Sequence, residues 1–136
     1  MPDKTLTLLV VLIIILSLGH DIDHTIRGDF RWQLTAESVP VFIIIALKYA
    51  ILGFGLVFYL KNKIGPLFWA IVTGIGVALG WLAHFSPFSD QTPQFIYRAY
   101  ETAAGGTLAV GWLAALMLVL IATMVYAQYL WARGVK

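Results

Sequence analysis

The sequence predicts an all-α integral membrane protein, a single domain over residues 1–136 in which four transmembrane helices form a bundle. Of its residues, 60% are hydrophobic and only 12% are charged, whereas soluble domains carry about 25% charged residues. Four long runs are almost free of charge and are separated by short polar connections, a pattern typical of multi-pass proteins. The predicted spans cover residues 5–24, 39–60, 67–85 and 103–129.

The first two predicted spans begin at different signals. The first contains residues 6–18, a run without any charged side chain. The second begins beside Pro40, a residue that suits the first turn of a helix because the N–H it lacks would have no intrahelical partner there. Lys48 is the charged residue within this second span, and an ionisable group at such a depth needs a partner or a route to water.

Glycine, proline and threonine mark the boundaries of the last two spans. Gly65 and Pro66 end one helix and start the next within a tight turn. Thr92 and Pro93 are predicted to be the N-cap and first residue of the final helix. Residues 94–102 are mixed in polarity, so we expect them to lie at the membrane interface before the helix crosses the bilayer.

A stripe of small residues runs along the third predicted span. Gly76, Gly80 and His84 are spaced four residues apart, so they share one face of a helix. Small residues at this spacing let a neighbouring helix approach closely. We therefore expect His84 to point into the bundle and away from lipid.

The distribution of lysine and arginine predicts that both termini are cytoplasmic, and the expected location of the protein is the plasma (inner) membrane. The terminal side carries five such residues, namely Lys4, Lys61, Lys63, Arg133 and Lys136, and the other side carries three, namely Arg27, Arg31 and Arg98. The expected surroundings are the lipid bilayer. Nucleic-acid binding is not expected, because the net charge of +2 is too small to indicate it. The absence of cysteine excludes disulfides, thiolate catalysis and cysteine-ligated metals.

A polar cluster follows the first apolar run. With 100° per residue on a helix, His20, Asp23, His24 and Arg27 fall within about 100° of arc, and Asp21 lies just outside it. Ionisable groups at this position are costly unless they pair, bind a ligand or reach water. The cluster is therefore the candidate functional site.

The four-span topology brings all three histidines to the same membrane surface. His20, His24 and His84 would supply three nitrogen ligands, with Asp23 or Asp90 as a fourth ligand or an orienting group. Three imidazoles with one open position are the ligand set of a catalytic zinc site. The sequence therefore predicts a divalent metal, with zinc favoured, although imidazole also suits copper, iron and nickel.

Two other interpretations of the histidines stay open. In one, histidine, aspartate and arginine side chains form a hydrogen-bonded network that only holds the first and third helices together. In the other, His84 and one of His20 and His24 are the axial ligands of haem b.

The chemistry of Lys48 is also open. An outward-pointing Lys48 side chain would reach the depth of His20 and pair with Asp21 or Asp23. This pair would be structural, or Lys48 would act in catalysis or proton transfer. The candidate catalytic residues are Asp23, Lys48 and Asp90.

The residue types of His20, His24, His84, Ser86 and Asp23 resemble the zinc site of ceramidase-like membrane hydrolases. This resemblance implies three histidine ligands with nearby aspartate and serine. It covers only these five residues. The chain departs from that group in two ways, because the group has more spans and its serine precedes its histidines. We assign no family.

The sequence favours an outward-facing metal site, with metal-dependent hydrolysis of a lipid or small amphiphile as the expected chemistry. One alternative is a non-catalytic accessory subunit of a larger membrane complex, or a homo-oligomer, with a purely structural His/Asp/Lys cluster. Further alternatives are a haem b electron-transfer protein and a small transporter that uses Lys48.

Overall fold

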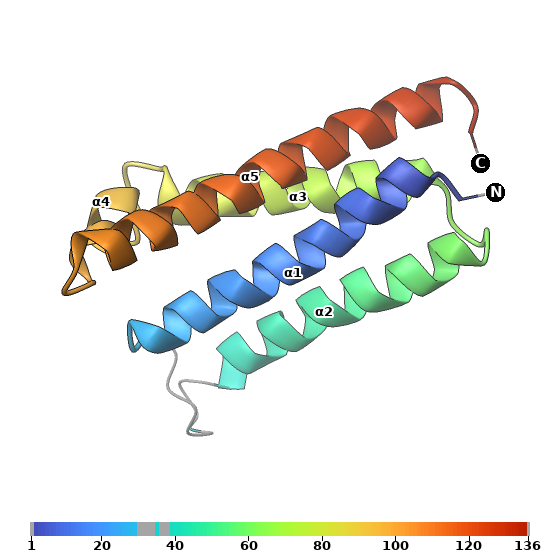
Figure 1. The fold of residues 1–136 in the computed structure, drawn as a ribbon. Helices are drawn as coiled ribbons and strands as arrows, with labels where there is room; N and C mark the ends of the chain where they lie inside the picture. The colour runs from blue at the N-terminus through green and yellow to red at the C-terminus, as the bar shows by residue number, and fades with distance from the viewer. Residues whose placement is uncertain (1, 30–34, 36–38, 136) are drawn as a thin grey trace.

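The computed structural model describes residues 2–29, 35 and 39–135, and this part of the chain is all-helical (Figure 1). Arg31 and Lys136, which entered the charge count, lie outside the described residues. No strand occurs in the described ranges. The helices are α1 (Lys4–Ile26), α2 (Val39–Leu60), α3 (Pro66–His84), α4 (Pro93–Arg98) and α5 (Ala103–Ala132).

Four of these helices are long and apolar enough to cross a membrane, namely α1, α2, α3 and α5. They contain 23, 22, 19 and 30 residues, and about 20 residues span the hydrocarbon core of a bilayer. The predicted fold class, a bundle of four apolar helices, is therefore confirmed. Helix α4 has only 6 residues and leads into α5.

Side chains and prolines fix where the helices begin. The side chain of Asp3 accepts a hydrogen bond from the Leu6 N–H at the start of α1. Pro66 is the first residue of α3. Thr92 caps a helix whose first residue is Pro93, as the sequence predicts, but this is the separate short helix α4, because the final helix α5 begins anew at Ala103 with Thr102 as its N-cap. These contacts satisfy or avoid backbone N–H groups that have no partner within the first helical turn.

Helix α5 is the centre of the packing, because α1, α3 and α4 all contact it. Helix α2 lies along α1 on the side away from α5 (Figure 1). The main core includes Leu6, Val10, Tyr59, Trp69 and Leu130. The two termini and the α2–α3 turn lie at one end of the bundle, and α4 lies at the other (Figure 1), which we call the inner and outer ends.

The glycine stripe of α3 faces α5, but side chains rather than a helix backbone fill the space beside it. A Cβ at Gly76 would lie 3.2 Å from the Leu120 side chain, and one at Gly80 would lie 2.6 Å from the sulfur of Met117. His84, at the end of the stripe, is only 4% exposed. The prediction that His84 points into the bundle is confirmed.

Candidate metal centre

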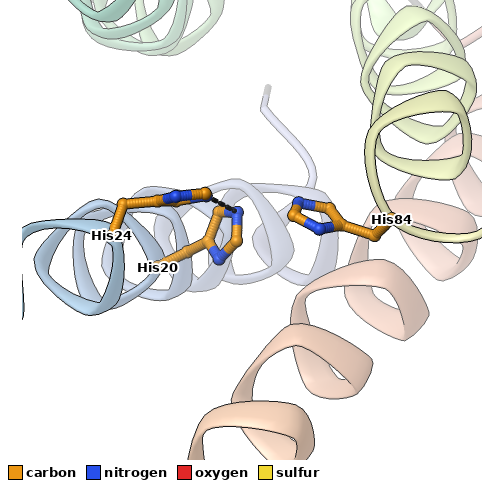
Figure 2. A group of neighbouring side chains, drawn as sticks. All are labelled: His20, His24 and His84. Carbon is orange, nitrogen blue, oxygen red and sulfur yellow. Dashed lines mark hydrogen bonds between the residues drawn. The ribbon is translucent and has the colours of Figure 1, made fainter. Parts of the chain in front are cut away.

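Three histidine rings meet near the outer end of the bundle, where α1 and α3 end (Figure 2). The ring centroid of His20 lies 4.6 Å from that of His24 and 5.0 Å from that of His84. One ring nitrogen from each residue lies within 4.8 Å of the others. The sequence separates His84 from the other two by about sixty positions, so tertiary packing of α3 against α5 and of α5 against α1 creates this group.

A tryptophan of α5 holds α1 one turn before His20. The indole N–H of Trp112 donates to the main-chain oxygen of Leu16, with an N–O distance of 2.8 Å. Gly19 makes room for this ring, because a Cβ there would lie 2.4 Å from it. Leu16 is also the helical partner of the His20 N–H, so this contact fixes α1 relative to α5 next to the candidate site.

The turn that ends α1 brings Asp29 back to His24. Gly28 has φ +79°, the N–H of Gly28 donates to Thr25, and the N–H of Asp29 donates to the His24 carbonyl. This is a Schellman motif, in which glycine takes the left-handed conformation after the last helical residue. As a result, Asp29 Oδ2 lies 3.0 Å from His24 Nδ1.

The tautomer of His24 decides what its other nitrogen can do. When Nδ1 carries the proton, it donates to Asp29, and Nε2 keeps its lone pair. His24 Nε2 lies 3.3 Å from His20 Nε2. Arg27 Nη2 also approaches His24 Nδ1, at 3.1 Å, and would donate to it in the opposite tautomer. Asp29 and Arg27 therefore compete for the same ring atom.

Only one neutral tautomer of His84 is compatible with its hydrogen bond. Its Nδ1 lies 2.9 Å from the main-chain oxygen of Gln91, and a carbonyl oxygen can only accept a hydrogen bond. Nδ1 must therefore carry the proton in a neutral ring, which leaves the lone pair on Nε2. The α3–α4 connection holds Gln91 in place, since its N–H donates to Ser89 Oγ at 3.0 Å and its side chain accepts from Arg27 Nη1 at 2.8 Å.

Arg27 joins the segment that follows α1 to the α3–α4 connection. Its side chain is only 1% exposed, and a guanidinium at that depth requires several acceptors. Nη1 lies 2.5 Å from Asp29 Oδ2 and 2.8 Å from Gln91 Oε1, while Nε donates to Asp23 Oδ2 at 2.9 Å. Arg27 is thus the hub of the hydrogen bonds around the histidines.

Asp23 is engaged on both oxygens. Arg27 binds Oδ2, and the Tyr100 hydroxyl donates to Oδ1 at 2.5 Å. Partial burial, followed by this hydrogen bond to a carboxylate, raises the pKa of the Tyr100 phenol to about 12. Asp23 is not among the side chains whose ligand atoms gather within 4.8 Å in the described ranges, and neither is Asp90, which is exposed.

Lys48 pairs with Asp21. Its Nζ lies 2.7 and 2.6 Å from the two carboxylate oxygens of Asp21, and the Tyr49 hydroxyl donates to Oδ2 at 2.7 Å. The predicted pairing of Lys48 with an α1 carboxylate is therefore confirmed, with Asp21 as the partner. Asp21 and Asp23 are about 200° apart on the helix, so they serve different neighbours.

Sequence reasoning did not identify Asp29, Gln91, Tyr100 or Trp112 as parts of this region. For Asp29 a local signal exists, because a glycine directly after the C-cap residue of a helix is typical of a Schellman motif that folds the chain back. For Gln91, Tyr100 and Trp112 the contact partners lie 64, 77 and 96 positions away. No local pattern reports contacts at that distance.

Comparisons with known protein families, with characterised proteins and with solved structures find no match for this chain. The candidate centre therefore stands on its own geometry.

Proposed function

We propose that this multi-pass membrane protein binds one divalent metal ion, with zinc favoured, through His20, His24 and His84. The observation that carries the proposal is the hydrogen bond from His84 Nδ1 to the Gln91 carbonyl. Metal-ligating histidines almost always donate their second ring N–H to a carbonyl or carboxylate. The Asp29 carboxylate stands in the same relation to His24.

The distances between the ring nitrogens support the same proposal. For zinc–nitrogen bonds of about 2.0–2.1 Å in a tetrahedral site, ligand nitrogens lie about 3.3–3.4 Å apart. His20 Nε2 and His24 Nε2 are already separated by 3.3 Å. One ring nitrogen of each histidine lies within 4.8 Å of the others, so shifts of at most about 1.5 Å bring the three nitrogens to this spacing.

Three protein ligands favour a catalytic centre over a structural one. Structural zinc sites have four protein ligands, whereas catalytic sites keep one position for water or substrate. The bound metal would supply hydrolytic chemistry by acidifying a water molecule. We propose hydrolysis of a lipid or small amphiphile: the water oxygen bonds to the carbonyl or phosphoryl centre, the bond to the leaving group breaks, and the leaving group takes the proton.

The charged residues around the centre have distinct proposed roles. Asp23 orients Arg27 and Tyr100 rather than binding the metal directly, because both of its oxygens already accept hydrogen bonds. Lys48 balances the charge of Asp21. Asp90 is exposed near the same surface and has no proposed role at the metal.

The test is elemental analysis, with a visible absorption spectrum, of protein purified in detergent without a histidine tag. We expect about one metal ion per chain and its loss in the double variant His20→Ala/His24→Ala, with unchanged helix content. The variant Lys61→Ala, at the opposite end of the bundle, is the control and should keep the metal. Unchanged metal content in the double variant would contradict the proposal, and a Soret band would indicate haem b instead.

The same contacts favour one alternative, a non-catalytic subunit of a larger complex. Arg27 donates to Asp23, Asp29 and Gln91, so this network can hold α1 and the α3–α4 connection together without any metal. This alternative predicts a metal-free, colourless protein that co-purifies with partner subunits or with further copies of itself from gently solubilised membranes.

A further inference from the structure

The inner half of α2 is held by close packing. Its buried residues are Leu52, Gly55 and Tyr59. A Cβ at Gly55 would lie 2.7 Å from the Phe68 ring and 3.1 Å from the Trp69 ring, so α3 contacts the α2 backbone here. The Tyr59 hydroxyl also accepts a hydrogen bond from the Asp3 N–H at 3.0 Å. These contacts fix the end of α2 that adjoins the α2–α3 turn.

The outer half of α2, residues 39–51, is held differently. It contains no buried residue, and many of its large apolar side chains are exposed, namely Val39, Val41, Ile43, Ile44, Leu47 and Ile51. Three polar side chains join it to α1, because Lys48 and Tyr49 both bind the carboxylate of Asp21. We call these three residues the latch.

Gly53 separates the two halves. A Cβ at Gly53 would meet nothing within 4 Å, so packing does not require glycine at this position. Glycine in a helix interior weakens the helix locally because it gains the most conformational freedom when the helix bends or opens. The helix therefore has its weakest point next to Leu52, where buried packing begins.

The latch adjoins the histidine centre along α1, since Asp21 directly follows His20. Figure 2 shows the three rings in the space between α1 and α3, with α2 further from the rings than either of these helices. The outer half of α2 is therefore tied to the same stretch of α1 that carries His20 and His24, while the three rings lie on α1 and α3.

We propose that the outer half of α2 is a gate that bends at Gly53 and, when the latch opens, admits an amphiphile to the histidine centre sideways from the bilayer. This inference rests on the proposed function and names the substrate class of the same site. Lipid can cover the apolar side chains of the outer half in either position, so opening loses little buried apolar surface. The latch is then a polar restraint on opening. A molecule with an apolar tail and a polar head matches an apolar route that leads to a polar centre.

The movement can be measured by electron spin distance measurements, because the chain contains no cysteine and two introduced cysteines can carry spin labels. The pair Ile44→Cys/Leu82→Cys reports the outer half of α2 relative to α3, and Val57→Cys/Leu67→Cys reports the inner half. All four positions are exposed. The triple variant Asp21→Asn/Lys48→Met/Tyr49→Phe removes the latch without leaving an unpaired charge.

We expect removal of the latch to broaden the distance distribution of the outer pair of labels and to lengthen its mean by several ångströms. The distribution of the inner pair should stay unchanged. Adding Gly53→Ala should narrow the outer distances again, whereas Gly111→Ala, at a similarly open position of α5, should not. Unchanged outer distances, or equal changes in both pairs, would overturn the gate. If the latch variant does not fold, Gly53→Ala with an intact latch should still narrow the outer distribution, and the absence of narrowing would overturn the hinge.

The substrate class can be tested with two hydroxamates, which bind metals, on protein loaded with cobalt(II). Dodecylhydroxamate partitions into micelles, and acetohydroxamate stays in water. Removal of the latch should accelerate the visible spectral change at least threefold with the dodecyl compound and leave the rate with acetohydroxamate unchanged. Equal acceleration of both would overturn entry from the bilayer. The spin distances do not depend on metal, so a failed gate and a failed metal site give different results.

Discussion

The Asp29 carboxylate lies 3.0 Å from His24 Nδ1 because Gly28 turns the chain back over the end of α1. The same carboxylate receives Arg27 Nη1. In the tautomer that metal binding through Nε2 requires, Asp29 accepts the Nδ1 proton of His24 and Nε2 points toward His20, while Arg27 balances the charge of Asp29. A surface loop residue thereby orients the ring of a candidate metal-binding histidine.

Replacing Asp29 with asparagine should weaken metal binding. Loss of a carboxylate behind a ligating histidine typically costs about 10- to 100-fold in metal affinity. Asp29→Asn should therefore raise the Kd for zinc, measured by competition with a chelator, by about this factor. The matched control is Asp90→Asn, which removes an exposed carboxylate near the same surface and should leave the Kd unchanged. Equal Kd values for the two variants would refute the role of Asp29.

Adding one methyl group at Gly19 should destabilise the bundle. A Cβ there would lie 2.4 Å from the Trp112 ring, and overpacking of this kind costs about 1–3 kcal/mol. Gly111→Ala is the control, because a Cβ there meets nothing within 4 Å and helix propensity favours alanine. Thermal unfolding in detergent should separate the variants in opposite directions. A Gly19→Ala protein as stable as the parent would mean that Trp112 does not clamp α1.

Tyr100 should make stability depend on alkaline pH. The pKa of its phenol is raised to about 12 by burial and by Asp23, so the folded state holds this proton more tightly than the unfolded state. Its contribution to stability is complete below about pH 10 and is lost as the pH rises toward about 12. Unfolding temperatures measured across this range should fall less steeply for Tyr100→Phe than for the parent.

The control for that titration is Tyr97→Phe, at a neighbouring exposed tyrosine, which should follow the parent. If Tyr100→Phe also follows the parent, the hydrogen bond to Asp23 does not couple proton binding to folding.

The orientation of the bundle is a further prediction from the charge distribution. With five basic residues on the terminal side against three on the other, both termini should be cytoplasmic. A fluorescent protein that folds only in the cytoplasm should be active when fused to the C-terminus. A phosphatase that is active only in the periplasm should be inactive there. A fusion inserted after Asp90, in the α3–α4 connection at the outer end, should give the reverse pattern. Phosphatase activity at the C-terminus would show that the orientation is the opposite of the predicted one.

The fold was predictable because membrane insertion depends on local properties. Length, apolarity and boundary residues such as Pro66 and Thr92 are all visible within a single helix. The partner of Lys48 was not decidable, because Asp21 and Asp23 lie about 200° apart and either one can face α2. Only the rotation of α1 against α5, which the Trp112 contact fixes, directs Asp21 to Lys48.

The convergence of the three histidines was predictable, but the residues that orient them were not. His20 and His24 share a helix face, and the glycine stripe directs His84 inward, so their convergence follows from local spacing and topology. Gln91 reaches His84 through its main-chain oxygen, and a main-chain group leaves no trace in the residue type. Such a contact depends on the path of the α3–α4 connection alone.

The Arg27–Gln91 hydrogen bond joins residues 64 positions apart, and this spacing has a consequence for biogenesis. A nascent chain that has inserted only α1 and α2 holds His20 and His24 but neither His84 nor the Gln91 carbonyl. The three rings come together only after the second helical hairpin has entered the bilayer and docked. Any ligand that needs all three is therefore acquired only after both hairpins have entered the membrane.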